Sequence, residues 1–401
     1  MRLPDASAGR VVWSLPLAVV RLAGCVSNSA VSRTLRIAHV LSSFGTGGQE
    51  FVALELATGQ VERGHEVHAV SLAPPPDGPM AELFARARVP TITLGRRRSG
   101  FDWTLPPRLA WWIRSQRLSV VHTHNPTPLL YAALASRIAG AALIHSKHGI
   151  NPGSKLNKRA RRLLAHLTHS FVAVSDVTAE QARVQRDCPP DRLRTINNGI
   201  DVERFRPDPE ARREIREEFG IPESAWVVGT VGRVDRNKNQ SLLIAAVTPH
   251  LAGDFRLMHI GDGPMMADIR ALVEKHPGRA HIHLAGRRGD VPRCLNAFDV
   301  FALSSDSEGL PLVIPEAMAT RLPVVSTAVG GIPRVVVDGE TGYVVPAGDE
   351  KALGDRLHAL ASDRDMAREF GDKGYERALS EYSARRMNDD YLDLYYEALG
   401  R

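Results

Sequence analysis

Apolar runs alternate with amphipathic segments along the chain from residue 35 onward. The run "LRIAHVLSS" (residues 35–43) is typical of a buried strand, and the glycine-rich "FGTGGQE" follows it. The segment "EFVALELATGQVERG" predicts a helix with Phe51, Leu54 and Val61 on one face, and "HEVHAVSL" predicts a second strand. Strand, glycine turn, helix and strand form a βαβ unit, which begins a parallel sheet.

The same alternation continues in two series. In the first, "LSVVHTHN", "AALIHSKHG" and "HSFVAVSD" predict strands, and "PLLYAALASRIAG" predicts a helix. The second starts at Trp226 with the strand "AWVVGTVGR" and the helix "NKNQSLLIAAVTPHL", and further strands are predicted at "FRLMHIG", "AHIHLAG", "FDVFALSS" and "LPVVSTAVGG". Between the series, "NNGIDVERFRPDPEARREI" is rich in proline and charge, so we predict a linker there.

These patterns predict an α/β protein with two doubly wound domains that face a cleft. A chain of 401 residues also exceeds the usual size of a single core. We place the N-terminal domain at residues 34–205 and the C-terminal domain at 206–380, followed by an amphipathic helix at 381–401 that crosses between them. Because ligands of such sheets bind beyond the carboxyl ends of the strands, the cleft is the expected site.

Residues 1–33 differ from the rest of the chain. The run "VVWSLPLAVVRLAGC" is interrupted by Pro16 and Arg21 and is too short to span a bilayer. We expect a disordered extension or a start codon assigned too early, and a cytoplasmic protein. The three cysteines, Cys25, Cys188 and Cys294, are too widely spaced for a disulfide framework or a metal knuckle, which fits a reducing compartment.

The formal net charge of +6 is concentrated in the first half of the chain. One group of cations comprises Arg86, Arg88, Arg96, Arg97, Arg98, Arg108, Arg114 and Arg117, and a second comprises Lys155, Lys158, Arg159, Arg161 and Arg162. Such clusters fit an anionic partner, namely a phosphorylated substrate, a membrane surface or a nucleic acid. A chain in which arginine is simply plentiful is an equally good explanation.

The second group of cations lies in an amphipathic segment. In "SKLNKRARRLLAHL", Leu156, Leu163 and Leu167 share one face and the cations lie mainly elsewhere. This arrangement suits the surface of an anionic bilayer, and it equally suits an ordinary basic surface helix. The arginines also suggest a nucleic-acid binder, but the sequence lacks the expected aromatic platforms and any recognised binding module, so we expect no nucleic-acid partner.

Several nucleotide motifs are missing. The chain has no Gly-x-x-x-x-Gly-Lys-Ser/Thr, and "GTGGQE" lacks the Gly-x-Gly-x-x-Gly spacing of a dinucleotide site. The Asp-x-Asp pair of Asp363 and Asp365 falls in a helical surface stretch and not after a buried strand. It is therefore a poor candidate for a metal that holds a sugar nucleotide.

Two cations follow the first strand of the second series. "GRVDRNKN" places Arg233 and Lys238 at the carboxyl end of a sheet, where a helix begins. Fixed positive charge beside free N–H groups suits a diphosphate. A basic loop before a helix is also common in proteins that bind no anion.

Two carboxylates frame the apolar segment "SEGLPLVIPEAMA". Seven residues separate Glu308 from Glu316, Gly309 allows the backbone to approach a ligand, and Pro315 suits the first turn of a helix. Carboxylate oxygens accept hydrogen bonds from hydroxyl groups, so this pair suits a sugar. The general preference of acids for helix N-termini explains Glu316 as well, but not the glycine and proline around Glu308.

Histidines gather at the ends of two predicted strands. We expect His122 and His145 to be satisfied core residues, and His124 to lie where its strand opens into the cleft. His148 ends the second of these strands. Many imidazoles can form a zinc site, but no carboxylate or thiolate lies nearby in the sequence to complete one, so we expect no metal.

Together these motifs resemble the family-four retaining glycosyltransferases, which have the two-Rossmann (GT-B) fold. The resemblance runs from about residue 35 to the C-terminus. It depends on Gly-Gly-x-Glu at Gly47, Gly48 and Glu50, and on "VHTHN", "KHG", "NNGID", "GRVDRNKN" and "GDGP", which begins at Gly261. The most diagnostic part is Glu-x₇-Glu, formed by Glu308 and Glu316. The order of these motifs along the chain is stronger evidence than any one of them.

The resemblance implies a role for each matching residue. Arg233 and Lys238 hold the diphosphate as it leaves, and Glu316 accepts from the ribose hydroxyls. Glu308 contacts the donor sugar beside the amides of Gly309 and Leu310, and His124 binds the same sugar from the N-terminal domain. Further donor contacts are implied at Gly261, and an acceptor or phosphate loop is implied at Gly47, Gly48, Glu50 and His148.

The resemblance also implies a reaction without metal or cofactor, because arginine, lysine and a helix N-terminus replace the cation. We therefore expect sugar transfer from a nucleotide donor, a UDP-sugar by family frequency, to a glycan or lipid-linked acceptor in surface polysaccharide synthesis. Retention without an enzymatic nucleophile suggests front-face attack. We expect the enzyme in the cytoplasm, with peripheral contact at the inner face of the plasma membrane. The alternatives are a sugar-nucleotide epimerase and a non-catalytic binding protein.

Overall fold

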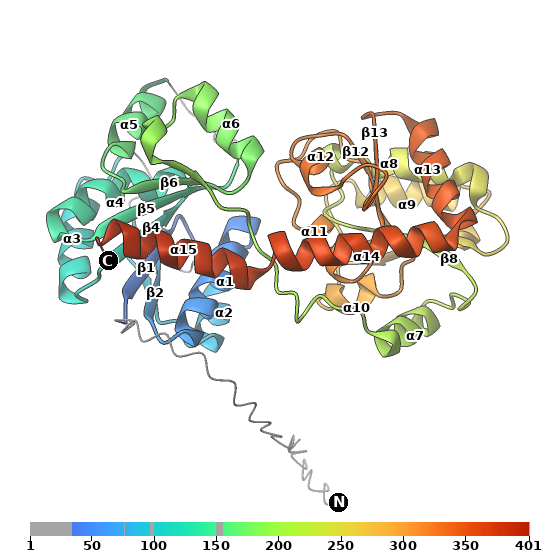
Figure 1. The fold of residues 1–401 in the computed structure, drawn as a ribbon, viewed down its shortest axis with the longest axis horizontal. Coiled ribbons are helices and arrows are strands. Elements are labelled where there is room, and N and C mark those ends of the chain that lie inside the picture. The colour runs from blue at the N-terminus through green and yellow to red at the C-terminus, as the bar shows by residue number, and fades with distance from the viewer. Residues whose placement is uncertain (1–33, 76, 97–99, 150–154, 401) are drawn as a thin grey trace, which may run out of the picture. The chain divides into compact units, whose positions relative to one another are not determined.

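The computed structural model describes residues 34–75, 77–96, 100–149 and 155–400, with the side chains of residues 155–157 excepted. The predicted N-terminal extension, Cys25, Arg97 and Arg98 lie outside the described residues, as do the side chains of Lys155 and Leu156. Within the described chain, two parallel sheets are each built from βα units (Figure 1). The prediction of an α/β protein with two doubly wound domains is confirmed.

The first sheet contains seven strands in the order β3-β2-β1-β4-β5-β6-β7. The strands are β1 (Arg36–Leu41), β2 (Glu66–Ser71), β3 (Thr91–Thr93), β4 (Val120–His124), β5 (Ala142–Lys147), β6 (Ser170–Ala173) and β7 (Leu193–Thr195). Its helices are α1 (Gly48–Glu62), α2 (Met80–Arg86), α3 (Leu105–Ser115), α4 (Pro126–Ala139), α5 (Lys155–Ala165) and α6 (Asp176–Gln185). We call this part, residues 34–205, the N-terminal half.

The second sheet contains six strands in the order β10-β9-β8-β11-β12-β13. The strands are β8 (Trp226–Val231), β9 (Phe255–Ile260), β10 (Ile282–Gly286), β11 (Val300–Leu303), β12 (Val324–Thr327) and β13 (Gly342–Val345). Its helices are α7 (Pro209–Glu218), α8 (Gln240–Val247), α9 (Met266–Glu274), α10 (Val291–Leu295), α11 (Val313–Ala319), α12 (Ile332–Val335), α13 (Glu350–Ser362) and α14 (Arg364–Glu381). We call residues 206–381 the C-terminal half.

Both sheets reverse their strand order beside the first strand, between β1 and β4 and between β8 and β11. Helices therefore cover both faces, so the central strands are buried on both sides and appear in the sequence as continuous apolar runs. β4 is buried along its whole length, although it carries two histidines. The carboxyl ends at each reversal are where doubly wound sheets bind ligands.

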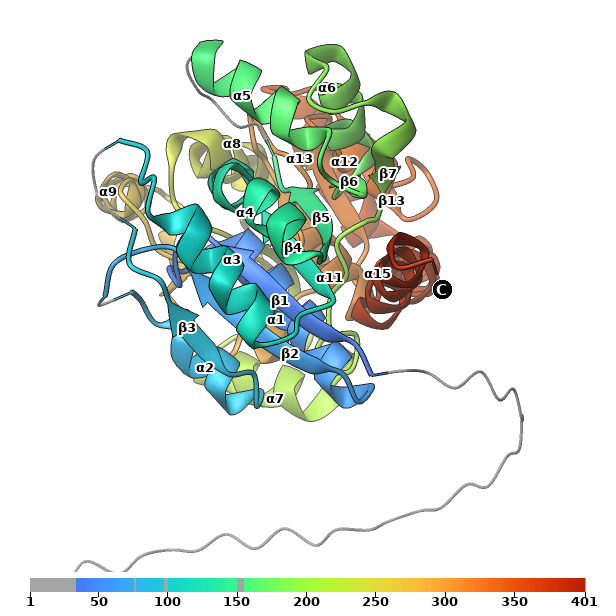
Figure 2. The ribbon, with the colours of Figure 1, turned by 90° about the vertical axis from the view of Figure 1, so that its left-hand side faces the viewer.

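The chain ends by returning to the N-terminal half. α14 packs on α11, whereas the last helix, α15 (Ala384–Ala398), packs on α1 and β5. Figure 2 shows α15 beside the N-terminal sheet, and the isolated bridge between Ile200 and Ser383 lies at the junction between the two helices. The predicted crossing is thus a pair of helices broken at Tyr382 and Ser383, where the Ser383 hydroxyl caps α15.

One local prediction was wrong. The predicted linker contains α7, which begins at Pro209. Asp208 caps this helix and Pro209 suits its first position, so the segment is helical although it has few apolar residues. On α1 the buried face carries Val52, Ala53 and Leu56, whereas the side chain of Phe51 is 46% exposed. Phe51 lines the cleft described below, which explains an apolar residue outside the core.

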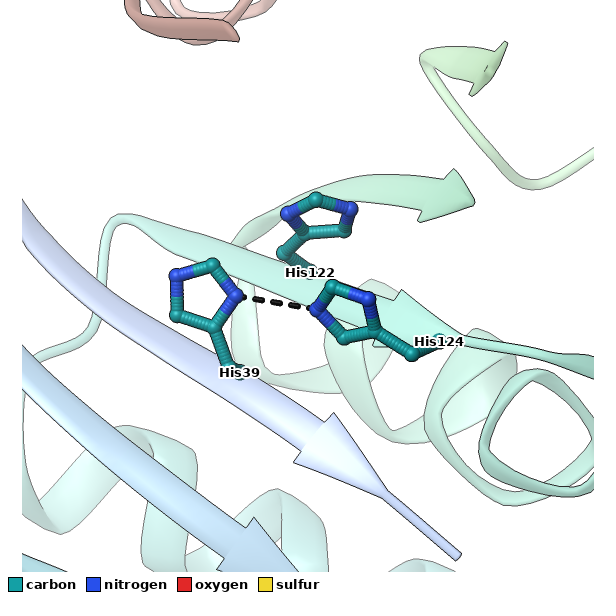
Figure 3. Close-up of side chains that lie close together, drawn as sticks. All are labelled: His39, His122 and His124. Carbon is teal, nitrogen blue, oxygen red and sulfur yellow. Dashed lines mark hydrogen bonds between the residues drawn. The ribbon is translucent and has the colours of Figure 1, made fainter. Parts of the chain in front are cut away.

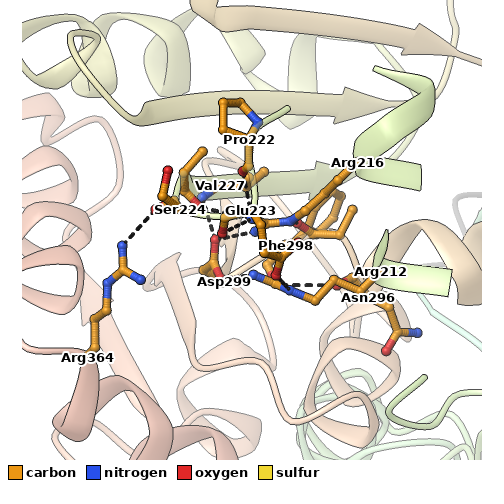
Figure 4. Close-up of polar contacts among 12 residues, drawn as sticks. Arg212, Arg216, Pro222, Glu223, Ser224, Val227, Asn296, Phe298, Asp299 and Arg364 are labelled. Atoms are coloured by element: carbon orange, nitrogen blue, oxygen red, sulfur yellow. Dashed lines mark hydrogen bonds and ion pairs between the residues drawn. The ribbon is translucent and has the colours of Figure 1, made fainter. Parts of the chain in front are cut away.

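Two arginines, the buried Arg216 and the half-buried Arg212, attach α7 to the second sheet (Figure 4). The guanidinium of Arg216 donates to Asp299 at 2.7 Å and to several carbonyl oxygens, and Arg212 donates to the other carboxylate oxygen at 2.9 Å. Asp299 also accepts from the Val227 backbone N–H at the start of β8. Arg212 and Arg216 therefore hold α7 on the sheet. Asp363 is structural too, because it caps α14, while Asp365 is exposed and pairs with Arg368.

Candidate functional site

A cleft of about 600 Å³ lies between elements of the two halves. Its lining includes Phe51 and Glu55 of α1 and residues of the segment 199–205. From the C-terminal half it includes residues of β8, the loop after it and α11. The cleft brings together three of the predicted residues, Arg233, Lys238 and Glu316. Glu308 joins them through an ion pair with Lys238.

Lys238 ends a short 3₁₀ turn after β8, and its position is fixed on three sides. Asp235 caps this turn by accepting from the N–H of Lys238, and the Ser304 hydroxyl donates to the Lys238 carbonyl. The Lys238 Nζ lies 2.5 Å from Glu308 Oε1, which also accepts from Ser305 Oγ at 2.6 Å. The ammonium group is thus held at the carboxyl edge of the sheet by a carboxylate.

Arg233 is held far less tightly. Its side chain is 71% exposed, and its Nε lies 3.9 Å from Asp235, at the limit of an ion pair. An exposed guanidinium on a loop at the cleft is free to turn toward an anion, and its planar donors match two phosphate oxygens. The two predicted cations therefore differ, since Lys238 is held by a carboxylate and Arg233 is largely exposed.

Glu316 lies in the first turn of α11 and lines the cleft. Burial raises the pKa of its carboxyl to about 7, and the positive charge of Arg204 acts weakly in the opposite direction. Within the described part of the chain, no side chain or backbone group hydrogen-bonds to this carboxylate. An unpartnered acid in a cleft suits a ligand that brings its own hydroxyl donors.

Glycines allow the loops around the cleft to pack closely. Gly261 has φ +138°, and a Cβ there would lie 1.9 Å from the Gly232 carbonyl oxygen. Gly330, with φ +57°, would place a Cβ 2.1 Å from the Glu308 carbonyl oxygen. By contrast, Gly309 has open space around it and contributes its carbonyl to the Gly331 N–H at 2.7 Å. The tight contact at the Glu308 loop is therefore made at Gly330, while Gly309 and the half-buried Leu310 leave room beside it.

Three further charged residues of the cleft were not predicted. Glu55 faces Asp201 and Arg204 across it, and burial followed by the charge of Asp201 raises the pKa of the Glu55 carboxyl to about 7. Asp201 ends the quoted "NNGID" motif, so its position carried a signal. Glu55 is one acid among several on α1 in the sequence, and only the packing of α1 distinguishes it.

The glycine loop, "VHTHN" and "KHG" meet at the carboxyl ends of β1, β4 and β5. Gln49 donates to Glu50 at 2.5 Å and accepts from the side chain of Asn125, whose Oδ1 accepts from the His148 N–H at 3.1 Å. Glu50 is only 5% exposed, and burial raises the pKa of its carboxyl. Gly47 is the N-cap of α1 and Gly48 is its first residue, so the loop has no side chains there that would keep a ligand away from the backbone.

Three histidines, His39, His124 and His148, are joined by hydrogen bonds beside this loop. Figure 3 shows His39 and His124 with the neighbouring His122. His39 Nδ1 lies 3.0 Å from His124 Nε2, and His124 Nδ1 lies 2.9 Å from His148 Nε2. Gln60 Oε1 lies 2.9 Å from His39 Nε2. Burial lowers the pKa of His39 and of His148 to about 4, and it lowers that of His124 well below 6.5, so the imidazoles are neutral near pH 7.

The predicted position of His124 was wrong, because its side chain is fully buried and does not open into the cleft. At the end of β4, its two ring nitrogens contact His39 and His148, and the His148 ring packs beside it. The role in donor binding that the resemblance implies for His124 stays a prediction. The core positions expected for His122 and His145 are confirmed, since His122 bonds Tyr395 and Ser146, and His145 bonds Thr123.

Nitrogens of His39, His122 and His124 lie within 4.8 Å of one another, a spacing that fits a metal ion. Each ring nitrogen of these three residues, however, already has a hydrogen-bond partner. Neither a carboxylate nor a thiolate belongs to this cluster. The arrangement is therefore a hydrogen-bond network, and its geometry does not require a metal.

Comparison with known proteins gives consistent matches. Residues 46–204 match the family model described as Glycosyltransferase Family 4, and residues 211–377 match the model described as Glycosyl transferases group 1. The chain is 25% identical to the N-acetyl-alpha-D-glucosaminyl L-malate synthase of Bacillus anthracis, over 88% of this chain and 94% of that protein. It is 26% identical to the Escherichia coli UDP-Gal:alpha-D-GlcNAc-diphosphoundecaprenol alpha-1,3-galactosyltransferase, over 63% and 68%.

Solved structures share the fold. Anabaena Alr3699/HepE in complex with UDP has a TM-score of 0.80 at 21% identity, and the match covers 90% of this chain and 99% of that one. A glycosyltransferase from Rickettsia africae has a TM-score of 0.83 at 19% identity, over 91% and 99%. These neighbours establish the arrangement of two parallel α/β sheets in this chain.

Proposed function

Because the chain belongs to the family-four, group 1 glycosyltransferases, we propose that it transfers a sugar from a UDP-sugar to a glycan or lipid-linked acceptor with retention of configuration. The cleft that joins Arg233, Lys238 and Glu316 is the observation that carries this proposal. Among the relatives, the E. coli galactosyltransferase is named for a UDP-sugar donor and a lipid-linked acceptor, and the Anabaena structure holds UDP.

The parts of the cleft suit the two ends of such a donor. Lys238 and Arg233 supply positive charge where the diphosphate gains negative charge as the glycosidic bond breaks. Glu316, with no partner of its own in the described chain, accepts from hydroxyls that would otherwise stay unpaired. Lys238 exchanges its contact with Glu308 for phosphate oxygens, which frees Glu308 for the sugar. With two cations on the leaving group, we propose a reaction that needs no metal or other cofactor.

Isothermal titration calorimetry with UDP-, GDP- and ADP-sugars tests donor binding. We expect binding of a UDP-sugar, and Lys238→Ala and Glu316→Ala should each weaken it at least about tenfold, the scale of one lost charged contact. Lys275→Ala and Glu274→Ala are matched controls, because both residues are exposed on or just beyond α9 and do not line the cleft. No binding of any sugar nucleotide to folded protein would overturn the proposal.

Product analysis separates transfer from the alternative reactions. With an acceptor extract, NMR should show the anomeric configuration of the donor in the product, at the same rate with and without EDTA. A rate that EDTA abolishes would contradict metal independence, and an inverted product would contradict retention. Conversion of the donor to an epimer without acceptor would identify an epimerase.

We further propose that the N-terminal half contacts an anionic membrane from the cytoplasmic side. From Trp103 to Ser175 the sequence contains ten Lys or Arg residues and no Asp or Glu. On α3 and α4, which pack side by side (Figure 2), Trp111 is 72% exposed and Ile138 is 53% exposed, and Leu163 on α5 is 72% exposed. Exposed Trp and aliphatic side chains among cations suit a lipid headgroup region. No described helix has the length and apolar character needed to cross a bilayer.

Flotation with vesicles tests this contact. The protein should float with vesicles that contain phosphatidylglycerol and not with pure phosphatidylcholine, and less of it should float at high salt. Trp103, just before α3, is 80% exposed. Replacing it and Trp111 together by Ser should reduce flotation about tenfold, since both lose apolar area that would enter the headgroup region. Leu272→Ser, an exposed apolar residue of the C-terminal half, should change nothing. Equal flotation with neutral vesicles would contradict an electrostatic contact.

A further inference from the structure

The buried histidines of the N-terminal half form a chain whose direction can be deduced. A neutral imidazole has one N–H donor and one lone-pair acceptor, so each ring can donate on one side only. His39, His124 and His148 are neutral near pH 7, and they are joined end to end by hydrogen bonds of 2.9–3.0 Å. Once the proton position on one ring is known, the positions on the other two follow.

Gln60 determines that position. Its Oε1 faces His39 Nε2 and can only accept, while its Nε2 faces the Tyr395 hydroxyl at 3.5 Å. His39 therefore carries its proton on Nε2, and its Nδ1 accepts from His124 Nε2–H. The Nδ1 of His124 in turn accepts from His148 Nε2–H. The chain of donors runs from His148 through His124 and His39 to Gln60.

This deduction leaves a single acceptor at the open end. His148 Nδ1 must hold a lone pair, and it is a buried nitrogen without a hydrogen-bond partner in the described structure. Buried polar atoms are rarely left unpaired, so a partner outside the chain is expected. His148 ends just after β5, at the carboxyl edge of the sheet, where its backbone N–H contacts the Asn125 side chain and, through Gln49, the glycine loop.

We propose that Gln60, His39 and His124 are positioning residues that hold His148 in its Nε2–H tautomer, so that Nδ1 accepts a hydrogen bond from a substrate hydroxyl. The inference rests on the proposed function, because the hydroxyl belongs to the sugar donor or acceptor. A polar network of this kind can fix the tautomer of a distant ring, since reversal of one link requires reversal of every link.

The alternative use of these rings is metal binding. A metal at His39, His122 and His124 would need the lone pairs of His39 Nδ1 and His124 Nε2, and these two atoms share one hydrogen bond. A bound metal would therefore break the chain between His124 and His39. The hydrogen-bonded chain of histidines and a bound metal therefore cannot be present together, and NMR of the ring nitrogens distinguishes them.

Long-range ¹H–¹⁵N NMR of the full-length protein with labelled histidine reports the proton on each ring nitrogen. We expect Nε2–H on His39, His124 and His148 at pH 7.5. In Gln60→Met, which removes the acceptor at nearly the same volume, the tautomer of His148 should become mixed, and kcat/KM should fall at least about tenfold, the scale of a hydrogen bond lost at a substrate group. Ser146→Ala is the control, because it removes a partner of His122 but not a link of the chain.

The outcomes are distinct. An Nδ1–H tautomer at any of the three rings, or zinc in the purified protein that shifts these signals, would overturn the inference. So would an unchanged His148 tautomer and unchanged kcat/KM in folded Gln60→Met. UDP-sugar binding measured by calorimetry is independent of these signals, so it separates failure of this inference from failure of the proposed function.

Discussion

In the N-terminal half, His39 and His124 are buried as neutral rings joined by a hydrogen bond, with His122 packed against them, whereas in the C-terminal half Arg216 and Asp299 form an ion pair (Figures 3 and 4). Both groups stabilise the centre of a sheet. They differ in the change that destabilises them. A proton added to a neutral ring creates an unpaired charge, whereas an ion pair fails when one partner is removed.

The difference teaches that abundant arginine does not define a binding surface. The arginines of α7 are neutralised by acids, and their role is structural. The arginines of α3 and α4 have no acidic side chain in the same stretch of sequence to neutralise them. The predictions below test the two kinds of buried polar group, beginning with the largest effect.

Asp299→Ala should lower the free energy of unfolding by about 3–5 kcal/mol, because the buried Arg216 keeps its charge and loses its anion. Urea unfolding measures this change. The control Glu369→Ala removes the partner of Lys373 from an exposed pair on α14 and should change stability by about 0.5 kcal/mol or less. Equal effects of the two substitutions would refute a structural role for the Asp299 cluster.

Mild acid should destabilise the N-terminal half first. The pKa of His39 is about 4 in the folded protein and 6.5 ordinarily, so the unfolded chain binds more protons between these values. The contribution of His39 to the free energy of unfolding is fully present above pH 6.5. It is lost as the pH falls toward 4, and the loss is roughly 3 kcal/mol for this one ring. In the C-terminal half, burial lowers the pKa of His259 to about 4 as well, but five buried histidines with lowered pKa values lie in the N-terminal half, so the loss there is larger. The Arg288 guanidinium lowers the pKa of Asp290, so the contribution of that carboxylate is lost only below its ordinary value of 3.8.

Hydrogen exchange at pH 7.5 and pH 5 measures this order. Amides of β1, β4 and β5 should lose protection at pH 5 while those of β8 and β11 keep it. Equal loss of protection in both sheets would contradict the larger acid sensitivity that we assign to the histidines of the N-terminal half.

Tyr395→Phe should cost about 1–3 kcal/mol, because it removes the hydroxyl that bonds His122 at 2.6 Å and leaves a buried ring nitrogen unpaired. Thermal unfolding measures the loss. Tyr375→Phe, at a half-buried tyrosine on α14 that stacks with Arg321, should be close to neutral. A neutral Tyr395→Phe would show that water replaces the hydroxyl.

Much of the fold followed from the sequence, because strands buried on both faces must be apolar along their whole length. β1, β4, β8 and β11 lie where the apolar runs predicted them. α7 was missed because its stability depends on a cap and on partners in the second sheet, which a count of charge and proline does not reveal.

The site was predictable where motif and geometry coincide. Lys238, Glu308 and Glu316 sit at the ends of strands or the start of a helix, so their spacing already placed them at one edge of a sheet. Glu55 and Gln60 were not predictable, since both lie on α1 among similar residues and acquire their roles from what α1 packs against. His124 was misplaced because a strand end can be covered by a neighbouring ring.

The last helix has a consequence for the order of events during synthesis. Tyr391 and Tyr395 of α15 complete hydrogen bonds to Ser146 and His122, residues that leave the ribosome far earlier. Until the final residues emerge, the first sheet keeps unsatisfied polar groups and an uncovered apolar face. The half of the molecule that is translated first is thus the one that finishes folding last, and a nascent chain stalled before α15 should remain a substrate for chaperones and proteases.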